Sequence, residues 1–186
     1  EMIREDVYQV FDRMVEQVPA GSNGVIFTPW LNGERTPVDD HKTRGGFFNL
    51  SLHHNRPDLI RAVFEGVALN SRWLLRYVEK FIGRPFPAIN MIGGGANSDI
   101  WCQIHADALN RPIRQVQDPL KANTRGAAIL AGFALGATTF KEAAKRIEIQ
   151  QEFTPNSANR ELYNRLFDTF LAIYKQNQEI YAWLNG

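Results

Sequence analysis

The sequence predicts an α/β fold in which helices pack on a small sheet, and three observations support this prediction. Short apolar runs typical of buried strands alternate along the chain with longer segments of helical periodicity. A cluster of three glycines separates one such strand from the helix that follows it. The composition, with 44% hydrophobic and 22% charged residues over 186 positions, is that of a globular protein large enough to bury a core.

The bulk properties exclude several classes of protein. A formal net charge of +1 creates no strong field for nucleic acid or an anionic membrane. No apolar run is long enough to cross a bilayer, and the first residues do not form a signal peptide. The single cysteine, Cys102, can form no internal disulfide and fits a reducing compartment. We therefore expect a cytoplasmic protein without nucleic-acid or membrane partners. Glu1 in place of methionine indicates a fragment or a processed chain.

The first half of the chain is predicted to contain two helices and one strand. Apolar residues at helical spacing predict a helix that ends near Pro19, and residues 25–28 are typical of a short buried strand. Residues 29–46 form an irregular stretch that is too long for a plain connection. Asn55 can cap a long helix, which Gly83 would end in the left-handed conformation.

The second half of the chain is predicted to alternate between strands and helices. In order, the segments are a strand at 88–92, a helix at 98–109, a strand at 112–117, a helix at 125–135, a short helix capped by Thr139, a strand at 148–153 and a closing helix at 157–184. Small residues in the 125–135 helix favour close packing against another helix. With only about four strands in all, we expect further strands of this domain to lie upstream in a longer parent chain.

The glycine cluster is the sharpest local feature. Gly93, Gly94 and Gly95 lie between a predicted strand and a helix that Ser98 can cap. Residues without a Cβ let a ligand approach the backbone, and a helix start presents free N–H groups. A tight turn with close packing beneath it would need the same residues, so the local sequence leaves both interpretations open.

Two other kinds of site fit the sequence less well. The dinucleotide-binding fingerprint G-x-G-x-x-G would place its third glycine at Ser98, and its acidic residue, Asp118, is distant. The four histidines show no metal-ligand spacing with Cys102 or with carboxylates, so a surface or satisfied histidine is the better interpretation. Cys102 follows Trp101 in a predicted helix and is expected to be a core residue.

Five segments lie in the order and at the spacing of motifs of one enzyme family. They are FTPWLNGERTP at 27–37, the segment at 40–52, RAVFEGVA at 61–68, GGGANSDIW at 93–101 and GAA at 126–128. Together they resemble the FGGY family of carbohydrate kinases, and within it the xylulokinases. The two ends of the chain match that family in kind only.

This resemblance implies a fold and a division of labour. FGGY kinases have two lobes of the actin- and hexokinase-like (ribonuclease H-like) fold, with ATP and sugar in the cleft between them. Residues 1–186 resemble part of the C-terminal lobe, in which helices pack on a small mixed sheet and which supplies the adenosine pocket. The N-terminal lobe would be the partner that carries the D-x-G-T phosphate turn, most sugar contacts and the catalytic aspartate. Mg²⁺ would be held through the nucleotide phosphates.

The resemblance also assigns residues. Gly94, Gly95 and Ser98 align with adenine and ribose contacts, and Gly93 and Ala96 shape the same turn. No catalytic residue and no metal ligand is assigned to this chain, which by itself is expected to be inactive.

The implied reaction is ATP-dependent phosphorylation of a pentulose, D-xylulose to D-xylulose 5-phosphate. Kinases for gluconate, ribulose or another sugar share much of this lobe and remain alternatives, as do a standalone nucleotide-binding module and a Rossmann-type NAD-binding domain. The loop at Glu34 and Arg35 is expected to be held by an ion pair between these residues. An apolar face or sheet edge left uncovered would favour a homodimer.

Overall fold

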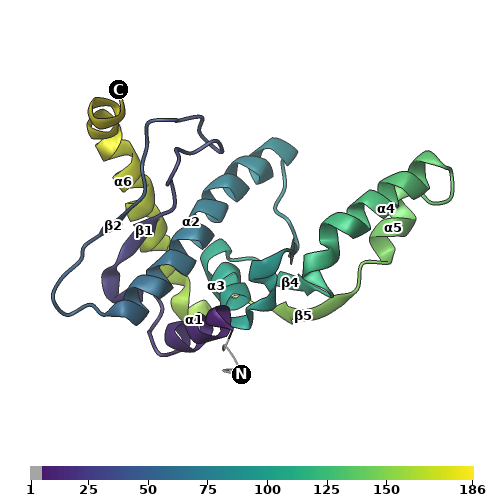
Figure 1. Ribbon diagram of the computed structural model, residues 1–186, viewed down its shortest axis with the longest axis horizontal. Coiled ribbons are helices and arrows are strands. Elements are labelled where there is room, and N and C mark those ends of the chain that lie inside the picture. The colour runs from purple at the N-terminus through teal and green to yellow at the C-terminus, as the bar shows by residue number, and fades with distance from the viewer. Residues whose placement is uncertain (1–5) are drawn as a thin grey trace, which may run out of the picture.

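The computed structural model describes residues 6–186 (Figure 1). Its helices and strands, in chain order, are α1 (Val7–Glu16), β1 (Ile26–Thr28), β2 (Gly46–Phe48), α2 (Arg56–Ile82), β3 (Ile89–Met91), α3 (Asp99–Leu109), β4 (Ile113–Val116), α4 (Ala122–Ala134), α5 (Phe140–Lys145), β5 (Ile149–Phe153) and α6 (Arg160–Asn185). Short 3₁₀ helices are η1 (Ser22–Gly24), η2 (Gly94–Asn97), η3 (Pro119–Lys121) and η4 (Ser157–Asn159). The predicted α/β alternation is confirmed, although the part of the opening helix expected at residues 1–5 lies outside the described residues.

The strands form two small sheets. β1 pairs antiparallel with β2, and a second sheet has the order β3-β4-β5, with β3 parallel and β5 antiparallel to β4. The central Ile113 faces Ile89 on one side and Phe153 on the other, and all three pack into the core. This arrangement confirms the expected small mixed sheet. The prediction missed β2, which has only three residues, begins with a glycine and is defined by its pairing with β1.

The long helix α2 follows its predicted signals closely. The Asn55 side chain accepts a hydrogen bond from the Asp58 amide, and the Asp58 carboxylate accepts one from the Asn55 amide, which completes a capping box. Gly83 has φ +72° and ends the helix in the left-handed region. Both ends of this helix are thus set by local sequence.

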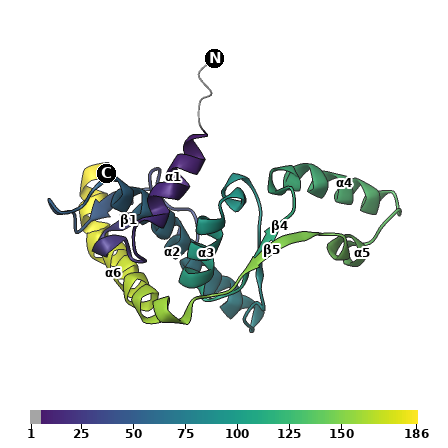
Figure 2. The same cartoon turned by 90° about the horizontal axis from the view of Figure 1, so that it is seen from below.

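α2 is the central element of the core. It contacts α1, α3, α6 and β1, and Figures 1 and 2 show it in the middle of the body with α6 along one side. An aromatic cluster joins these elements: Trp30 packs against Trp73 and Phe170, and Tyr174 closes the group. Trp30 and Phe170 are fully buried.

A buried carboxylate ties three segments of the chain together. Glu65 on α2 accepts hydrogen bonds from the Gly21 amide (2.9 Å), the Ser22 hydroxyl (2.8 Å), Arg61 Nε (2.8 Å) and the Tyr163 hydroxyl (3.0 Å). Burial raises the pKa of Tyr163 well above its usual range, and the nearby Glu65 charge raises it further. The glutamate of the RAVFEGVA segment therefore joins the turn before β1 to α2 and α6.

The arginine and the glycine of the same segment have structural roles as well. Arg61 donates to the carbonyl oxygens of Val15 and Val18, which satisfies the end of α1. A Cβ on Gly66 would lie 2.2 Å from the carbonyl oxygen of Phe27, so only glycine lets α2 approach β1 this closely. In the structure, the residues of this segment therefore stabilise the packing of α2 against α1 and β1.

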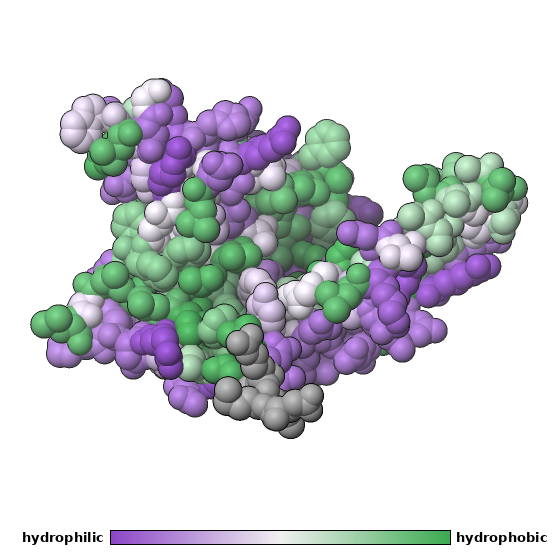
Figure 3. All heavy atoms as spheres, in the orientation of Figure 1, coloured by the Kyte–Doolittle hydropathy of each residue, from purple (hydrophilic) through white to green (hydrophobic). Residues whose placement is uncertain are grey.

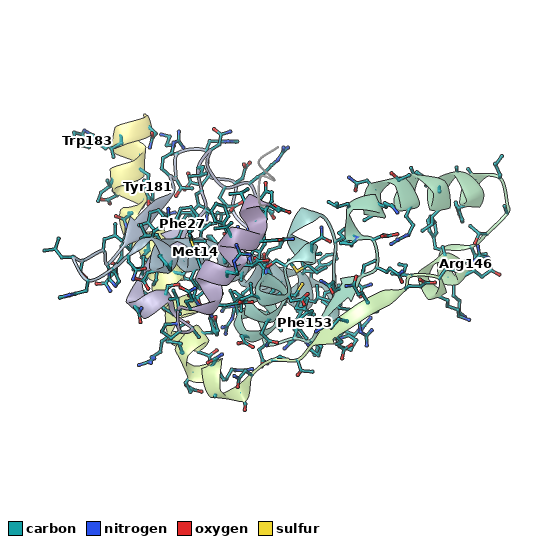
Figure 4. The ribbon with its side chains drawn as sticks, turned by 60° about the horizontal axis from the view of Figure 1, so that its bottom comes forward. Met14, Phe27, Arg146, Phe153, Tyr181 and Trp183 are labelled. Atoms are coloured by element: carbon teal, nitrogen blue, oxygen red, sulfur yellow. The ribbon has the colours of Figure 1, made fainter. Side chains whose placement is uncertain are left out.

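Helices α4 and α5 form an arm that projects from the body (Figures 1 and 2). Arg146, just after α5, lies out on this arm, whereas Phe27 lies in the body and Trp183 near the far end of α6 (Figure 4). No residue of α4 is buried. The arm carries exposed apolar side chains, namely Leu130, Phe133, Leu135 and Phe140. Figure 3 shows green, hydrophobic surface over the outer part of the arm.

The arm differs from its prediction in two ways. α4 begins at Ala122 rather than at residue 125, because η3 (Pro119–Lys121) runs directly into it. The small residues expected to support close helix packing, such as Ala127 and Ala128, are exposed within the described part of the chain.

Candidate nucleotide-binding turn

The glycine turn follows β3 and leads into α3 through one additional turn of helix. The sequence predicted a turn between the strand and the helix, and within this turn the residues of η2 (Gly94–Asn97) form a 3₁₀ helix. Gly93 has φ +83°, a conformation that glycine adopts without strain, and its amide donates to the carbonyl oxygen of Pro119 (3.0 Å). The turn is therefore attached to the connection that follows β4.

Gly95 is required by packing. A Cβ at this position would lie 2.7 Å from the Trp101 ring. That ring stacks on Phe64 at a centroid distance of 4.7 Å, and its Nε1 donates to the Phe64 carbonyl oxygen. The indole is thus fixed from α2, and only glycine fits above it.

Gly94 has no comparable structural reason to be glycine. Its φ lies outside the left-handed region, and a Cβ would meet only a Leu120 methyl group at 3.9 Å, an ordinary contact. No described atom lies within 4 Å of a Cβ placed on Gly93. Gly93 and Gly94 therefore present open backbone, next to a leucine that is 70% exposed.

Ala96 fixes the inner side of the turn. It is fully buried, and its carbonyl oxygen accepts hydrogen bonds from Gln115 Nε2 (2.6 Å) and from the Cys102 thiol (3.8 Å). The Gln115 amide belongs to β4, so the turn is attached to the sheet from below. The sequence analysis did not identify Gln115, and no motif in the sequence marks it.

Ser98 caps α3, as the sequence predicted. Its Oγ accepts a hydrogen bond from the Trp101 amide (3.2 Å) and donates one to Asp12 Oδ1 (2.7 Å) on α1. The residue is only 9% exposed. Its structural role is therefore clear, while its contact with a nucleotide stays a prediction.

The five candidate residues thus belong to one turn but have different exposure. Gly93, Gly94 and Gly95 are at least partly accessible, whereas Ala96 and Ser98 are buried. The open backbone at Gly93 and Gly94 is the part of the turn that a ligand could approach.

The loop around Glu34 is held differently from the prediction. The sequence suggested an ion pair with Arg35, but Glu34 Oε1 accepts from the backbone amides of Arg35 and Thr36, and Oε2 accepts from Asn70 on α2. The side-chain oxygen of Asn70, Oδ1, in turn accepts a hydrogen bond from Trp30 Nε1. The backbone donors lie one and two residues away, so the carboxylate closes a tight turn and ties it to α2, and the Arg35 side chain is left exposed.

Cys102 is a core residue, as predicted, and His105 is buried. Burial raises the pKa of the Cys102 thiol to about 12, so it is a poor nucleophile near neutral pH. Burial lowers the pKa of His105, whose Nδ1 lies 3.0 Å from the Trp101 carbonyl oxygen. The histidine is therefore satisfied within α3.

Residues 6–186 contain neither a metal-binding cluster nor a membrane-spanning helix. No group of three histidine, cysteine or acidic side chains there is placed to hold a metal ion. None of the helices in the same range is long and apolar enough to cross a membrane.

The model of the family described as "FGGY family of carbohydrate kinases, C-terminal domain" matches residues 4–135. A xylulose kinase of Staphylococcus epidermidis is 37% identical over 164 residues, which cover 87% of this chain and 33% of the relative. A xylulose kinase of Bacillus subtilis is 34% identical over 170 residues, which cover 89% and 33% respectively. The chain thus spans about a third of the length of these relatives.

Solved structures agree with the sequence comparisons. A gluconate kinase from Lactobacillus acidophilus superposes with a TM-score of 0.84 at 30% identity, covering 98% of this chain and 37% of that one. A ligand-bound xylulose kinase from the same organism gives 0.81 at 31% identity, covering 95% and 36%. These neighbours confirm the expected actin- and hexokinase-like fold. The chain belongs to the FGGY family of carbohydrate kinases and matches its C-terminal domain.

Proposed function

We propose that residues 1–186 form the nucleotide-binding, C-terminal lobe of an ATP-dependent sugar kinase. Family membership supports a kinase over an NAD-binding domain. The relatives are about three times as long as this chain, which supports a second lobe elsewhere in the parent protein and argues against a standalone module.

Gly94 is the observation that carries the nucleotide assignment. Neither its backbone conformation nor its packing explains the absence of a Cβ, whereas Gly93 and Gly95 have such explanations. A ligand that lies against the backbone would explain it, because a side chain would hold that ligand away. The adenosine of ATP is the proposed ligand, with the exposed Leu120 beside it.

The described residues fit a lobe that positions the nucleotide and does not perform the chemistry. Phosphoryl transfer depends on holding the nucleotide and the acceptor hydroxyl in line, together with a base for the hydroxyl proton. Asp99, the carboxylate next to the turn, accepts a hydrogen bond from Gln115 at the adenosine end, which suits positioning. When bound, Mg²⁺ would neutralise phosphate charge, and the proposal places it on the phosphates.

The proposed substrate is D-xylulose, phosphorylated to D-xylulose 5-phosphate. Xylulose kinases at 37% and 34% identity support it. Gluconate is the second candidate, supported by the gluconate kinase structure at a TM-score of 0.84 and a Bacillus subtilis gluconokinase at 29% identity. The sugar contacts would belong to the other lobe.

A valine at position 94 tests the nucleotide assignment in the full-length parent. Gly94→Val is expected to raise the KM for ATP by tenfold or more, a loss of about 1.4 kcal/mol, because the side chain would hold the base off the backbone. The KM for sugar should stay within about twofold, a change of under ~0.5 kcal/mol. Steady-state kinetics with D-xylulose and with gluconate would also show which sugar is used.

Gly46→Val is the matched control. A Cβ there makes only an ordinary contact with Phe48 at 3.7 Å, and the position lies on β2 away from the turn. If Gly94→Val raises the KM for sugar and leaves that for ATP unchanged, the turn is not the nucleotide contact. Equal melting temperatures for the two variants would exclude a folding defect as the cause.

A further inference from the structure

The central strand of the mixed sheet carries a polar side chain on its core face. Ile113 and Gln115 are two residues apart on β4, so their side chains point to the same face of the sheet, and both are buried. Ile113 packs into the hydrophobic core. Apolar residues are usual at such positions, yet Gln115 is only 2% exposed. The glutamine therefore needs a reason other than the pattern of the strand.

The stability of the fold does not supply that reason. The side-chain oxygen of Gln115, Oε1, is enclosed and has no hydrogen-bond donor among residues 6–186. A buried amide oxygen without a donor is unfavourable, and an apolar side chain of similar length would avoid this cost. Departures of this kind from the rules of core packing are expected at functional sites.

The nitrogen of the same amide holds the glycine turn. Gln115 Nε2 donates to the Ala96 carbonyl oxygen (2.6 Å) and to Asp99 Oδ1 (3.1 Å). Both partners are acceptors, so the NH₂ end of the amide must face the turn. The Ala96 amide in turn donates to the carbonyl oxygen of Gly93 (3.1 Å). The residue that Gln115 holds therefore closes the turn back to its first glycine.

The open backbone at Gly93 and Gly94 is restrained through its neighbours and not through side chains of its own. Glycine reaches more backbone conformations than any other residue. In this turn the Gly93 amide is bonded to the Pro119 carbonyl oxygen, and Ala96 fixes the other end. A backbone that is already ordered loses less entropy when a ligand binds to it. The hydrogen bond from Gln115 would therefore strengthen binding at the turn.

We propose that Gln115 is a positioning residue for the nucleotide. Without touching the nucleotide, its side chain holds Ala96, and through Ala96 it keeps the backbone of Gly93 and Gly94 in the conformation that binds adenosine. This inference rests on the proposed nucleotide site at the glycine turn. It explains why a glutamine with an unpaired oxygen occupies a core position of β4.

Gln115→Met removes the amide and keeps the length of the side chain. In the full-length parent it is expected to raise the KM for ATP by about three- to tenfold, the equivalent of one lost hydrogen bond. The kcat and the KM for sugar should stay within about twofold. The melting temperature should change little, because the variant removes the unpaired Oε1 but leaves the Ala96 carbonyl with only the Cys102 thiol as a donor. Steady-state kinetics and thermal unfolding measure these effects.

Gln151→Met is the matched control. Gln151 lies directly opposite Gln115 on β5 and is exposed, so the same chemical change is made in the same sheet without loss of the bond to Ala96. The KM for ATP should not change. An equal rise in this KM for the two variants would overturn the proposal, because the effect would then belong to the sheet as a whole.

A measurement on the native protein covers the case in which Gln115→Met does not fold. With ¹⁵N-labelled glutamine in the full-length parent, the side-chain amide resonance of Gln115 should shift when ADP saturates the protein, because this amide holds the turn on which the nucleotide lies. The resonance of the exposed Gln151 should stay in place. A Gln115 resonance that does not respond to ADP would contradict the positioning role.

Gly94→Val separates this inference from the proposed function. If Gly94→Val leaves the KM for ATP unchanged, the turn is not the nucleotide contact, and both proposals are wrong. If Gly94→Val raises that KM and Gln115→Met does not, the nucleotide site stands and the positioning role of Gln115 is wrong. A Gln115→Met variant that lowers kcat, raises both KM values and lowers the melting temperature would show a merely structural role, which also overturns the inference.

Discussion

Arg61 and Glu65 form a buried ion pair, and the Arg61 guanidinium also donates to the carbonyl oxygens of Val15 and Val18. Their side chains are 8% and 3% exposed, with 2.8 Å between Arg61 Nε and Glu65 Oε1. Arg61→Met is expected to destabilise the fold by about 3–5 kcal/mol, because it leaves the Glu65 carboxylate buried without its counter-charge. Urea denaturation of the variant and the native protein measures this difference.

Arg114→Met is the control for that prediction. Arg114 pairs with Glu152 across β4 and β5, but both side chains are more than two-fifths exposed, and such pairs contribute about 0–1 kcal/mol. Similar losses from the two substitutions would show that burial does not decide the energetics of these pairs.

Single-residue predictions succeeded where the partner lies nearby in sequence. Asn55 and Ser98 bond to amides three residues away, and Gly83 ends its helix by its own backbone conformation. Gln115 could not be found in this way, because its partner Ala96 is 19 residues earlier and is reached across the sheet. The same holds for Glu65, whose partners include Tyr163, 98 residues away.

At the scale of elements, two helical glycines are expected to respond oppositely to alanine. In Gly66→Ala the new Cβ would lie 2.2 Å from the Phe27 carbonyl oxygen, so α2 must shift from β1 at a cost of about 1–3 kcal/mol. In Gly126→Ala nothing lies within 4 Å of the new Cβ, so α4 should gain up to about 1 kcal/mol of helix stability.

Thermal unfolding of the two glycine variants measures both effects. If Gly66→Ala were neutral, the close approach of α2 to β1 would not require glycine. If Gly126→Ala were destabilising, a partner covering this face of the arm in the parent protein would be the explanation, since within residues 6–186 the position is open.

Whole elements were predictable where periodicity or caps define them. α2, α3 and α6 have long apolar faces and were expected within a few residues of their observed bounds. β2 was not, because three residues carry no periodicity and pairing with β1 is a tertiary contact. The solvent exposure of the arm could not be predicted either, because its alanine-rich sequence is also compatible with close packing.

At the scale of the molecule, the described chain has surfaces that a complete kinase would be expected to cover. β3 pairs only with β4 among the described strands, and the arm exposes apolar side chains (Figure 3). These surfaces would suit the missing part of the parent protein or a second copy of the chain. The expected homodimer stays a prediction, and so does the expected cytoplasmic location.

The whole-molecule prediction is that the 186-residue chain alone phosphorylates no sugar. Catalysis of phosphoryl transfer is mostly positioning, and the proposed base and sugar contacts belong to the other lobe. Within the described residues, Asp99, the carboxylate next to the proposed adenosine turn, accepts a hydrogen bond from Gln115. A coupled assay of ADP release with D-xylulose, D-ribulose and gluconate, run on the chain and on the full-length parent, measures this. Turnover by the chain that survives repurification and approaches the parent's rate would place the chemistry in this lobe. Activity that returns only when the N-terminal lobe is added in trans would support the proposed division of labour, because the reacting groups would then come from both lobes.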